Sequence, residues 1–204
     1  MEKVINMRLL EHIEENELLC ENQHGFIKGR SCLTNLLTTL EHWTREMDRG
    51  KDVDVIYLDF AKAFDSVPHK RLLKKIEGYG ISGQVLKWIR DFLHDRKQRV
   101  VYNDLASDWT EVWSGVPQGS VLGPTLFLIY VMDIPEEIDS NVAMFADDTK
   151  IYRVVQNDKD AERLQGDLDT IIKWSETWMM RFNVSKCKHM KISRNIADYY
   201  HLLM

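Results

Sequence analysis

The chain has 204 residues, of which 44% are hydrophobic and 29% charged, and its formal net charge is −5 at pH 7. This length and composition are sufficient for one globular domain with its own core. The acidic balance argues against a compact basic nucleic-acid-binding module, so a bound polyanion would need local basic stretches or metal ions.

The N-terminus and the cysteines indicate the cellular compartment. The first residues, MEKVINMRLLEHIEENE, are too charged for a signal peptide, and no apolar run approaches the length of a membrane span. The three cysteines are odd in number and far apart, which is typical of a reducing environment without disulfides. We therefore expect an intracellular protein that is not secreted and has no membrane partner, with nucleus and cytoplasm both open.

The first half of the chain predicts helices around one buried strand. Apolar residues at helical spacing follow Ser31, a candidate helix cap, and β-branched and aromatic residues dominate VDVIYLDF. The expected elements are a helix over 2–19, a helix from Ser31 to about Gly50, a strand over 53–60, a helix from Pro68 to Gly78 or Gly80, and a helix over 85–93.

The second half predicts two hairpins and two further helices. The expected elements are a hairpin of 98–103 and 108–114 around Asp104 to Ser107, a glycine-punctuated turn over 115–124, an apolar helix over 126–132, a hairpin of 141–146 and 149–155, a helix over 161–178 and a strand over 188–193. Helices interleave with strands, so the predicted fold class is α+β, an antiparallel sheet with helices on one face.

Three aspartates lie at the ends of apolar strands. Asp147 and Asp148 lie at the tip of the second hairpin, where turn chemistry alone would explain them, since Asp tolerates positive φ. Asp59 ends the most hydrophobic strand, where it could be a cap or a salt-bridge partner. If that strand pairs with the hairpin, the three carboxylates converge, and their repulsion raises their pKa values unless cations such as Mg²⁺ neutralise them.

Longer stretches around these aspartates resemble the ordered motifs of reverse transcriptases, in wording closest to the non-LTR retrotransposon type of the jockey/CR1-like group. The resemblance runs from about residue 20 to 193. It rests on QHGFIKGRSCLTNLL (23–37), YLDFAKAFDSVPHKRLL (57–73), GVPQGSVLGPTLFLIYVMDI (115–134), FADD (145–148) and RFNVSKCKHM (181–190).

The resemblance implies a polymerase palm-like antiparallel sheet with packed helices and partial fingers, and we expect no thumb. The expected division of the reverse transcriptase domain over 1–204 is partial fingers (1–50), palm (51–69 and 112–193), fingers-side helices and hairpin (70–111) and a truncated tail (194–204).

The resemblance also implies a metal site. Asp59 and Asp147 would bind two Mg²⁺ ions, for which Mn²⁺ could substitute, with Asp148 as an auxiliary carboxylate and the Phe60 carbonyl as a further ligand. Lys186 would lie near the leaving pyrophosphate as a candidate general acid, and its alternative is an exposed lysine in a basic turn.

A nucleotide-binding set is implied as well. Phe64 would lie beneath the sugar and exclude a 2′-hydroxyl, Gln118 and Gly119 would approach the nascent base pair, and Lys28 and Arg30 would contact the triphosphate, with Arg30 the primary contact. Core packing for Phe64, a helix-entry loop for 117–119 and a solvated surface loop for 28–30 are the alternatives.

Together these features predict an RNA-directed DNA polymerase fragment that transfers deoxynucleotides onto a primer 3′-hydroxyl, with an RNA template, a DNA primer and dNTPs as partners. An RNA-dependent RNA polymerase is disfavoured by the bulk of Phe64, and a group II intron-type reverse transcriptase would need a maturase region. A domesticated or decayed fragment that acts as a binding or interaction domain is the non-enzymatic alternative. The oligomeric state stays open.

Overall fold

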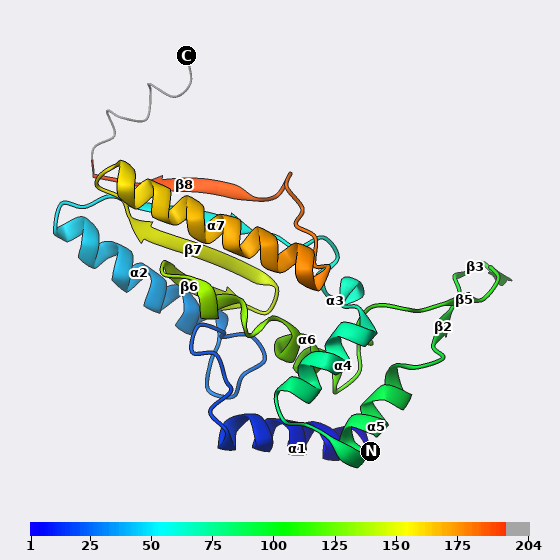
Figure 1. Ribbon diagram of the computed structural model, residues 1–204. Helices are drawn as coiled ribbons and strands as arrows, with labels where there is room; N and C mark the ends of the chain where they lie inside the picture. Colours follow the sequence, from blue (N-terminus) through cyan, green and yellow to red (C-terminus); the bar gives the residue numbers. More distant parts are fainter. Residues whose placement is uncertain (195–204) are drawn as a thin grey trace. The chain divides into compact units, whose positions relative to one another are not determined.

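A computed structural model describes residues 1–194 (Figure 1), so the predicted tail over 194–204 lies outside the described residues except for residue 194. The chain forms two compact units. We call them the helical unit, which contains Met1–Leu19, Ala61–Asp133 and Glu176–Arg181, and the sheet unit, which contains Cys20–Phe60, Ile134–Ser175 and the chain from Phe182 onward. The expected division into fingers and palm stays a prediction. In the described part of the chain, no helix has the length and apolarity needed to span a bilayer.

A four-stranded antiparallel sheet forms the core of the sheet unit, with the strand order β6-β7-β1-β8. The predicted pairing of the buried strand with the hairpin is confirmed, because β1 and β7 pair from Val53 with Val154 to Leu58 with Thr149. The elements of this unit are α2 (Cys32–Asp48), β1 (Val53–Leu58), a 3-10 turn (Ile134–Glu137), β6 (Asn141–Phe145), β7 (Asp148–Val154), most of α7 (Asp158–Trp178) and β8 (Lys188–Ile192).

Helices cover both faces of this sheet, where the sequence led us to expect one. Trp43 of α2 packs edge-on against Tyr152 of β7 at 5.8 Å between ring centroids. The next residue, Arg153, points to the opposite face and lies 3.6 Å from Asp167 of α7. Ile151 and Tyr152 are consecutive residues of β7, so their side chains point to opposite faces of the sheet. Both are buried, which shows that β7 is covered on each side.

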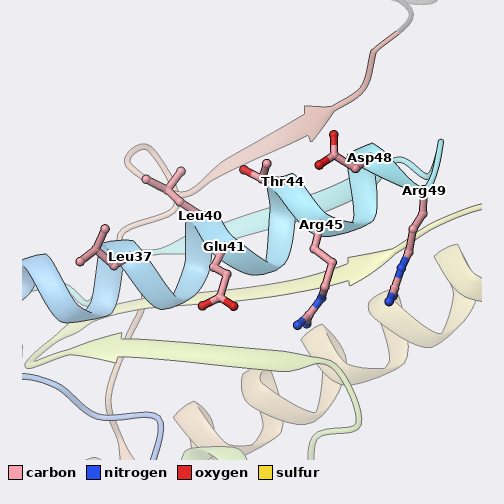
Figure 2. A pocket seen from close by; sticks show the side chains of 7 residues that line it. All are labelled: Leu37, Leu40, Glu41, Thr44, Arg45, Asp48 and Arg49. Atoms are coloured by element: carbon pink, nitrogen blue, oxygen red, sulfur yellow. The ribbon is translucent and has the colours of Figure 1, made fainter.

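Helix α2 begins at the predicted Ser31 cap, whose hydroxyl accepts the Thr34 N–H in a capping box. Its leucines, however, point away from the sheet: Leu33, Leu36, Leu37 and Leu40 are all exposed. The buried row is Asn35, Thr39 and Trp43, at a spacing of four residues. Figure 2 shows the outer surface of the helix, a shallow depression lined by Leu37, Leu40, Glu41, Thr44, Arg45, Asp48 and Arg49.

The helical unit is organised around the apolar helix α6, in which every residue except Pro124 is buried. α1 and α4 contact α6, and α5 contacts α4. The predicted hairpin is present, but its turn is tighter than expected and lies at Asn103 and Asp104, both with positive φ. The elements are α1 (Glu2–Glu15), α3 (Ala63–Ser66), α4 (His69–Gly78), α5 (Gly83–Leu93), β2 (Lys97–Gln98), β3 (Val101–Tyr102), β4 (Leu105–Ala106), β5 (Thr110–Glu111) and α6 (Gly123–Val131).

Candidate active site

The pairing of β1 with β7 brings the acidic residues of two distant motifs to one end of the sheet. The last pair is Leu58 with Thr149, so Asp59 and Asp148 are the next residues on the two strands. Asp147 precedes Asp148 in the turn between β6 and β7. The positive φ of this turn is at Ala146, at 57°, and neither aspartate adopts one. A need for positive φ therefore does not account for the two aspartates.

The Asp59 carboxylate lies in a position suited to a cation. Its Oδ1 is buried and, among the described residues, makes no hydrogen bond. The Lys186 ammonium lies 3.6 Å from this oxygen, beyond hydrogen-bond distance, on a side chain that is 64% exposed. The main-chain carbonyl of Asp59 accepts the Asn183 N–H at 2.7 Å, which ties the lysine-bearing loop to the end of β1. A buried carboxylate oxygen without a donor is costly unless a charged ligand satisfies it.

Asp147 is held where its negative charge is disfavoured. Burial, followed by the negative charges of Asp148 and Asp59, raises the pKa of Asp147, and the Lys186 charge offsets part of this. Carboxylates that repel one another in a half-buried position favour a divalent cation between them.

These residues fit a divalent-cation site that draws on other ligands too. In residues 1–194, no three His, Cys, Asp or Glu side chains are grouped so that they could hold a metal ion. A site with Asp59 and Asp147 would therefore take its remaining oxygens from the main chain, water and substrate phosphates, as Mg²⁺ commonly does. Phe60, whose carbonyl is a predicted ligand, is fixed by a bridge to Phe182 and by ring stacking on it at 4.6 Å.

A groove in the sheet unit adjoins these carboxylates. Asp59, Asp148, Lys150 and Lys186 are among the residues that line it. Lys150 is buried and donates to the Asn35 side chain at 3.0 Å, and burial lowers the pKa of its ammonium. Lys150 was not among the predicted site residues, although its place two residues after Asp148 on a strand predicts the same face.

The two predicted triphosphate contacts, Lys28 and Arg30, differ in their surroundings. Lys28 is exposed. The Arg30 Nη1 donates to three main-chain carbonyl oxygens, those of Cys20 at 3.0 Å, Glu21 at 2.9 Å and Gln23 at 2.6 Å. It therefore holds its own loop together in this structure, and its contact with a triphosphate stays a prediction.

In the helical unit, the segment that follows Asp59 contacts the predicted glycine-punctuated turn. Phe64 stacks on the buried Phe127 with ring centroids 4.3 Å apart, and its carbonyl accepts the Val116 N–H at 2.8 Å. Gln118 is exposed and donates to the Asp65 carboxylate at 3.0 Å.

Glycine is required where these two segments meet. Gly115 has a φ of +92°, and a Cβ on it would lie 3.0 Å from the Asp65 backbone. Gly119 also has positive φ, at 80°, so the predicted turn is built on left-handed glycines. The nucleotide contacts of Phe64, Gln118 and Gly119 stay predictions.

The raised pKa of Asp147 leads to a prediction for the metal-free chain. Because the folded state holds this proton more tightly than the unfolded state, the contribution of Asp147 to wild-type stability should fall as pH rises from the ordinary Asp pKa, about 4, through the raised one. Asp147→Asn has no such proton. The free energy of unfolding of wild type minus that of Asp147→Asn, measured by urea denaturation across pH, should therefore decrease over this window and level off above it. A difference that is independent of pH would contradict the assignment.

Comparison with known proteins agrees with the resemblance. A family profile described as "Reverse transcriptase (RNA-dependent DNA polymerase)" matches residues 1–197. The RNA-directed DNA polymerases from mobile element jockey of Drosophila melanogaster and Drosophila funebris are 30% and 29% identical to the chain, over 97% of its length. The chain spans about a fifth of these relatives, 22% of each.

The solved structures support the fold alone. Apo telomerase from Candida tropicalis superimposes with a TM-score of 0.69 at 9% identity, over 97% of this chain and 37% of that chain. A Candida tropicalis apo telomerase truncated from its C-terminal domain gives 0.68 at 10% identity, over 96% and 40%. The α+β fold with its antiparallel sheet is thus shared with these telomerase structures, and the family match over nearly the whole chain shows that this protein belongs to the reverse transcriptase family, with relatives among the non-LTR retrotransposon enzymes.

Proposed function

We propose that this chain is the polymerase portion of an RNA-directed DNA polymerase, which adds deoxynucleotides to a DNA primer along an RNA template. The observation that carries the proposal is the meeting of Asp59 with Asp147 and Asp148 at the paired ends of β1 and β7. In a member of the reverse transcriptase family, this is the feature that a nucleotidyl-transfer site requires.

The carboxylates of Asp59 and Asp147 would hold two Mg²⁺ ions, with Mn²⁺ as a substitute, assisted by Asp148 and the Phe60 carbonyl. When bound, the ions would activate the primer 3′-oxygen and stabilise the charge that develops on the leaving pyrophosphate. The buried Oδ1 of Asp59, which accepts no hydrogen bond from residues 1–194, and the raised pKa of Asp147 support this assignment.

Other residues would position the nucleotide and move a proton. Lys186, whose exposed ammonium is close to Asp59, would place a positive charge and a proton beside the leaving pyrophosphate. Lys28 would contact the triphosphate from its exposed position, and the donors of Arg30 other than Nη1 would do the same. Gln118 and Gly119 would approach the nascent base pair from their turn.

Primer extension tests this function. The chain is incubated with a primed RNA template, Mg²⁺ and either dNTPs or NTPs, and the products are separated by length. Template-dependent extension with dNTPs is the expected result, with NTPs used much less. Equal use of NTPs would identify an RNA-dependent RNA polymerase instead, and nucleotide addition without regard to the template would contradict the proposal.

The preference for dNTPs is expected to depend on Phe64. The stacked Phe127 ring holds the Phe64 ring in place, so Phe64→Ala opens space where a 2′-hydroxyl would clash. The ratio of NTP to dNTP incorporation should rise about 10- to 200-fold, the discrimination that a difference of one methylene group provides in a pocket. Phe92→Ala, which removes a ring stacked on Trp88 at 5.3 Å in the same unit, is the control and should leave the ratio unchanged. An unchanged ratio in Phe64→Ala would assign Phe64 to core packing alone.

A further inference from the structure

The turn that carries Asp147 is held by the side chain of Gln23, a residue 123 positions earlier in the chain than Ala146. The Gln23 Oε1 accepts the Ala146 N–H at 2.7 Å, and its Nε2 donates to the Ala146 carbonyl at 3.1 Å. The same Oε1 accepts the Gly25 N–H at 2.7 Å. Gln23 is 2% exposed, so one buried side-chain amide bonds to both polar groups of the Ala146 backbone.

The Ala146 backbone needs such a partner. Its φ of 57° is in the left-handed region, which alanine rarely adopts without support from its surroundings. Ala146 is also buried, and it lies between the last residue of β6 and the first of β7, beyond the ladder that pairs these strands. Its N–H and C=O would be costly to bury without the bonds to Gln23.

Gln23 is itself fixed, because its segment lies along the outer edge of β6. The Met144 N–H donates to the Asn22 carbonyl at 2.8 Å, and the His24 N–H donates to the Met144 carbonyl at 2.9 Å. Gly25 permits the close approach to the turn, since a Cβ on it would lie 2.3 Å from the Ala146 nitrogen. The short segment of residues 22–25 therefore contacts both the edge strand β6 and the turn at Ala146.

We propose that Gln23 is a positioning residue of the polymerase site, which fixes the Ala146 turn and so the direction in which the Asp147 carboxylate points. The inference rests on the proposed function, because it is the cation-binding role of Asp147 that gives this direction a consequence. Asp147 is repelled by Asp148 and Asp59. A turn released from Gln23 would let it move away from Asp59, and a pair of carboxylates spread apart binds a shared cation less tightly.

Three variants test the proposal. Gln23→Met keeps the size of the side chain and removes all three hydrogen bonds. Gln23→Glu keeps the shape of the side chain, and its protonated carboxyl group can accept the two N–H groups and donate to the Ala146 carbonyl, whereas the ionised form would place an oxygen against that carbonyl. Asn22→Ala is the matched control, because Asn22 lies in the same segment and its side chain donates to Val142 at 2.9 Å.

Two measurements are made on each variant without substrate. Backbone amide hydrogen exchange by NMR reports on the Ala146 and Gly25 N–H groups, and electron paramagnetic resonance titration reports on Mn²⁺ affinity. We expect Gln23→Met to accelerate exchange at both amides and to weaken Mn²⁺ binding about 10- to 100-fold, the range for residues that orient a metal ligand. Gln23→Glu, measured at a pH at which its carboxyl group is protonated, should keep the amide protection, and Asn22→Ala should match wild type in both measurements.

The outcomes separate this inference from the proposed function. If Gln23→Met exchanges at Ala146 and binds Mn²⁺ as Asn22→Ala does, Gln23 has no positioning role. If Gln23→Met does not fold, Gln23→Glu with its carboxyl group protonated decides the question, and loss of Ala146 protection in that form overturns the inference, because all three hydrogen bonds can be retained. If wild type binds no Mn²⁺, the proposed metal function fails, and amide exchange alone then decides whether Gln23 fixes the turn.

Discussion

Asp147→Asn is expected to lower primer extension by at least about 100-fold, as is typical when a transition-state charge loses its electrostatic partner. Asn has the same size as Asp, but its neutral amide oxygen is a poorer ligand for a hard divalent cation than a carboxylate. The Asn side chain also removes the repulsion from Asp148 and Asp59, so the metal-free variant should fold at least as well as wild type. Mn²⁺ titration and primer extension, measured on the same preparation, should therefore both show the loss.

Two matched variants accompany this experiment. Asp91→Asn removes an exposed carboxylate of α5 in the other unit and should leave extension and Mn²⁺ binding unchanged. Asp59→Asn should reproduce the loss, since Asp59 supplies the other proposed ligand. Extension by Asp147→Asn at the wild-type rate would show that the metal assignment is wrong, whatever the family.

Lys75→Met is expected to lower the free energy of unfolding by about 3–5 kcal/mol, which is typical when one partner of a buried ion pair is removed. Lys75 is 3% exposed in its side chain and donates at 2.5 Å both to the Asp133 carboxylate and to the Tyr130 carbonyl. Its ammonium also lies 4.0 Å from the centre of the Trp178 ring. Met keeps most of the volume but provides no charge and no donor. The free energy of unfolding from urea denaturation measures the effect.

A neighbouring lysine and a double variant identify the cause. Lys74→Met alters an exposed position of the same helix and should change stability by less than about 0.5 kcal/mol. Lys75→Met combined with Asp133→Leu removes both charges and should recover much of the loss, because a buried pair replaced by apolar residues can be nearly neutral. If the double variant is less stable than Lys75→Met alone, the unpaired Asp133 charge is not the cause.

The order of the helices and strands could be predicted from the sequence because it depends on local signals. The capping box at Ser31, the apolar strand over 53–58 and Pro68 before α4 each act within a few residues. The predicted ends of the elements were less accurate. For example, the sequence predicts a helix over 2–19, whereas α1 ends at Glu15. The sequence did not predict which face of α2 is buried, because the exposed leucines of this helix have the same helical spacing as its buried row.

By itself, the sequence determined the family and the element order, and it indicated the residues to which we assign the proposed chemistry, since these reside in contiguous motifs such as YLDF and FADD. Only the tertiary structure decided that Asp59 comes beside Asp148, that Arg30 bonds to its own loop, and that Gln23 holds the turn at Ala146. Strand register and the partner of a buried amide depend on which distant segments pack together, and the spacing of residues along a chain does not encode that choice.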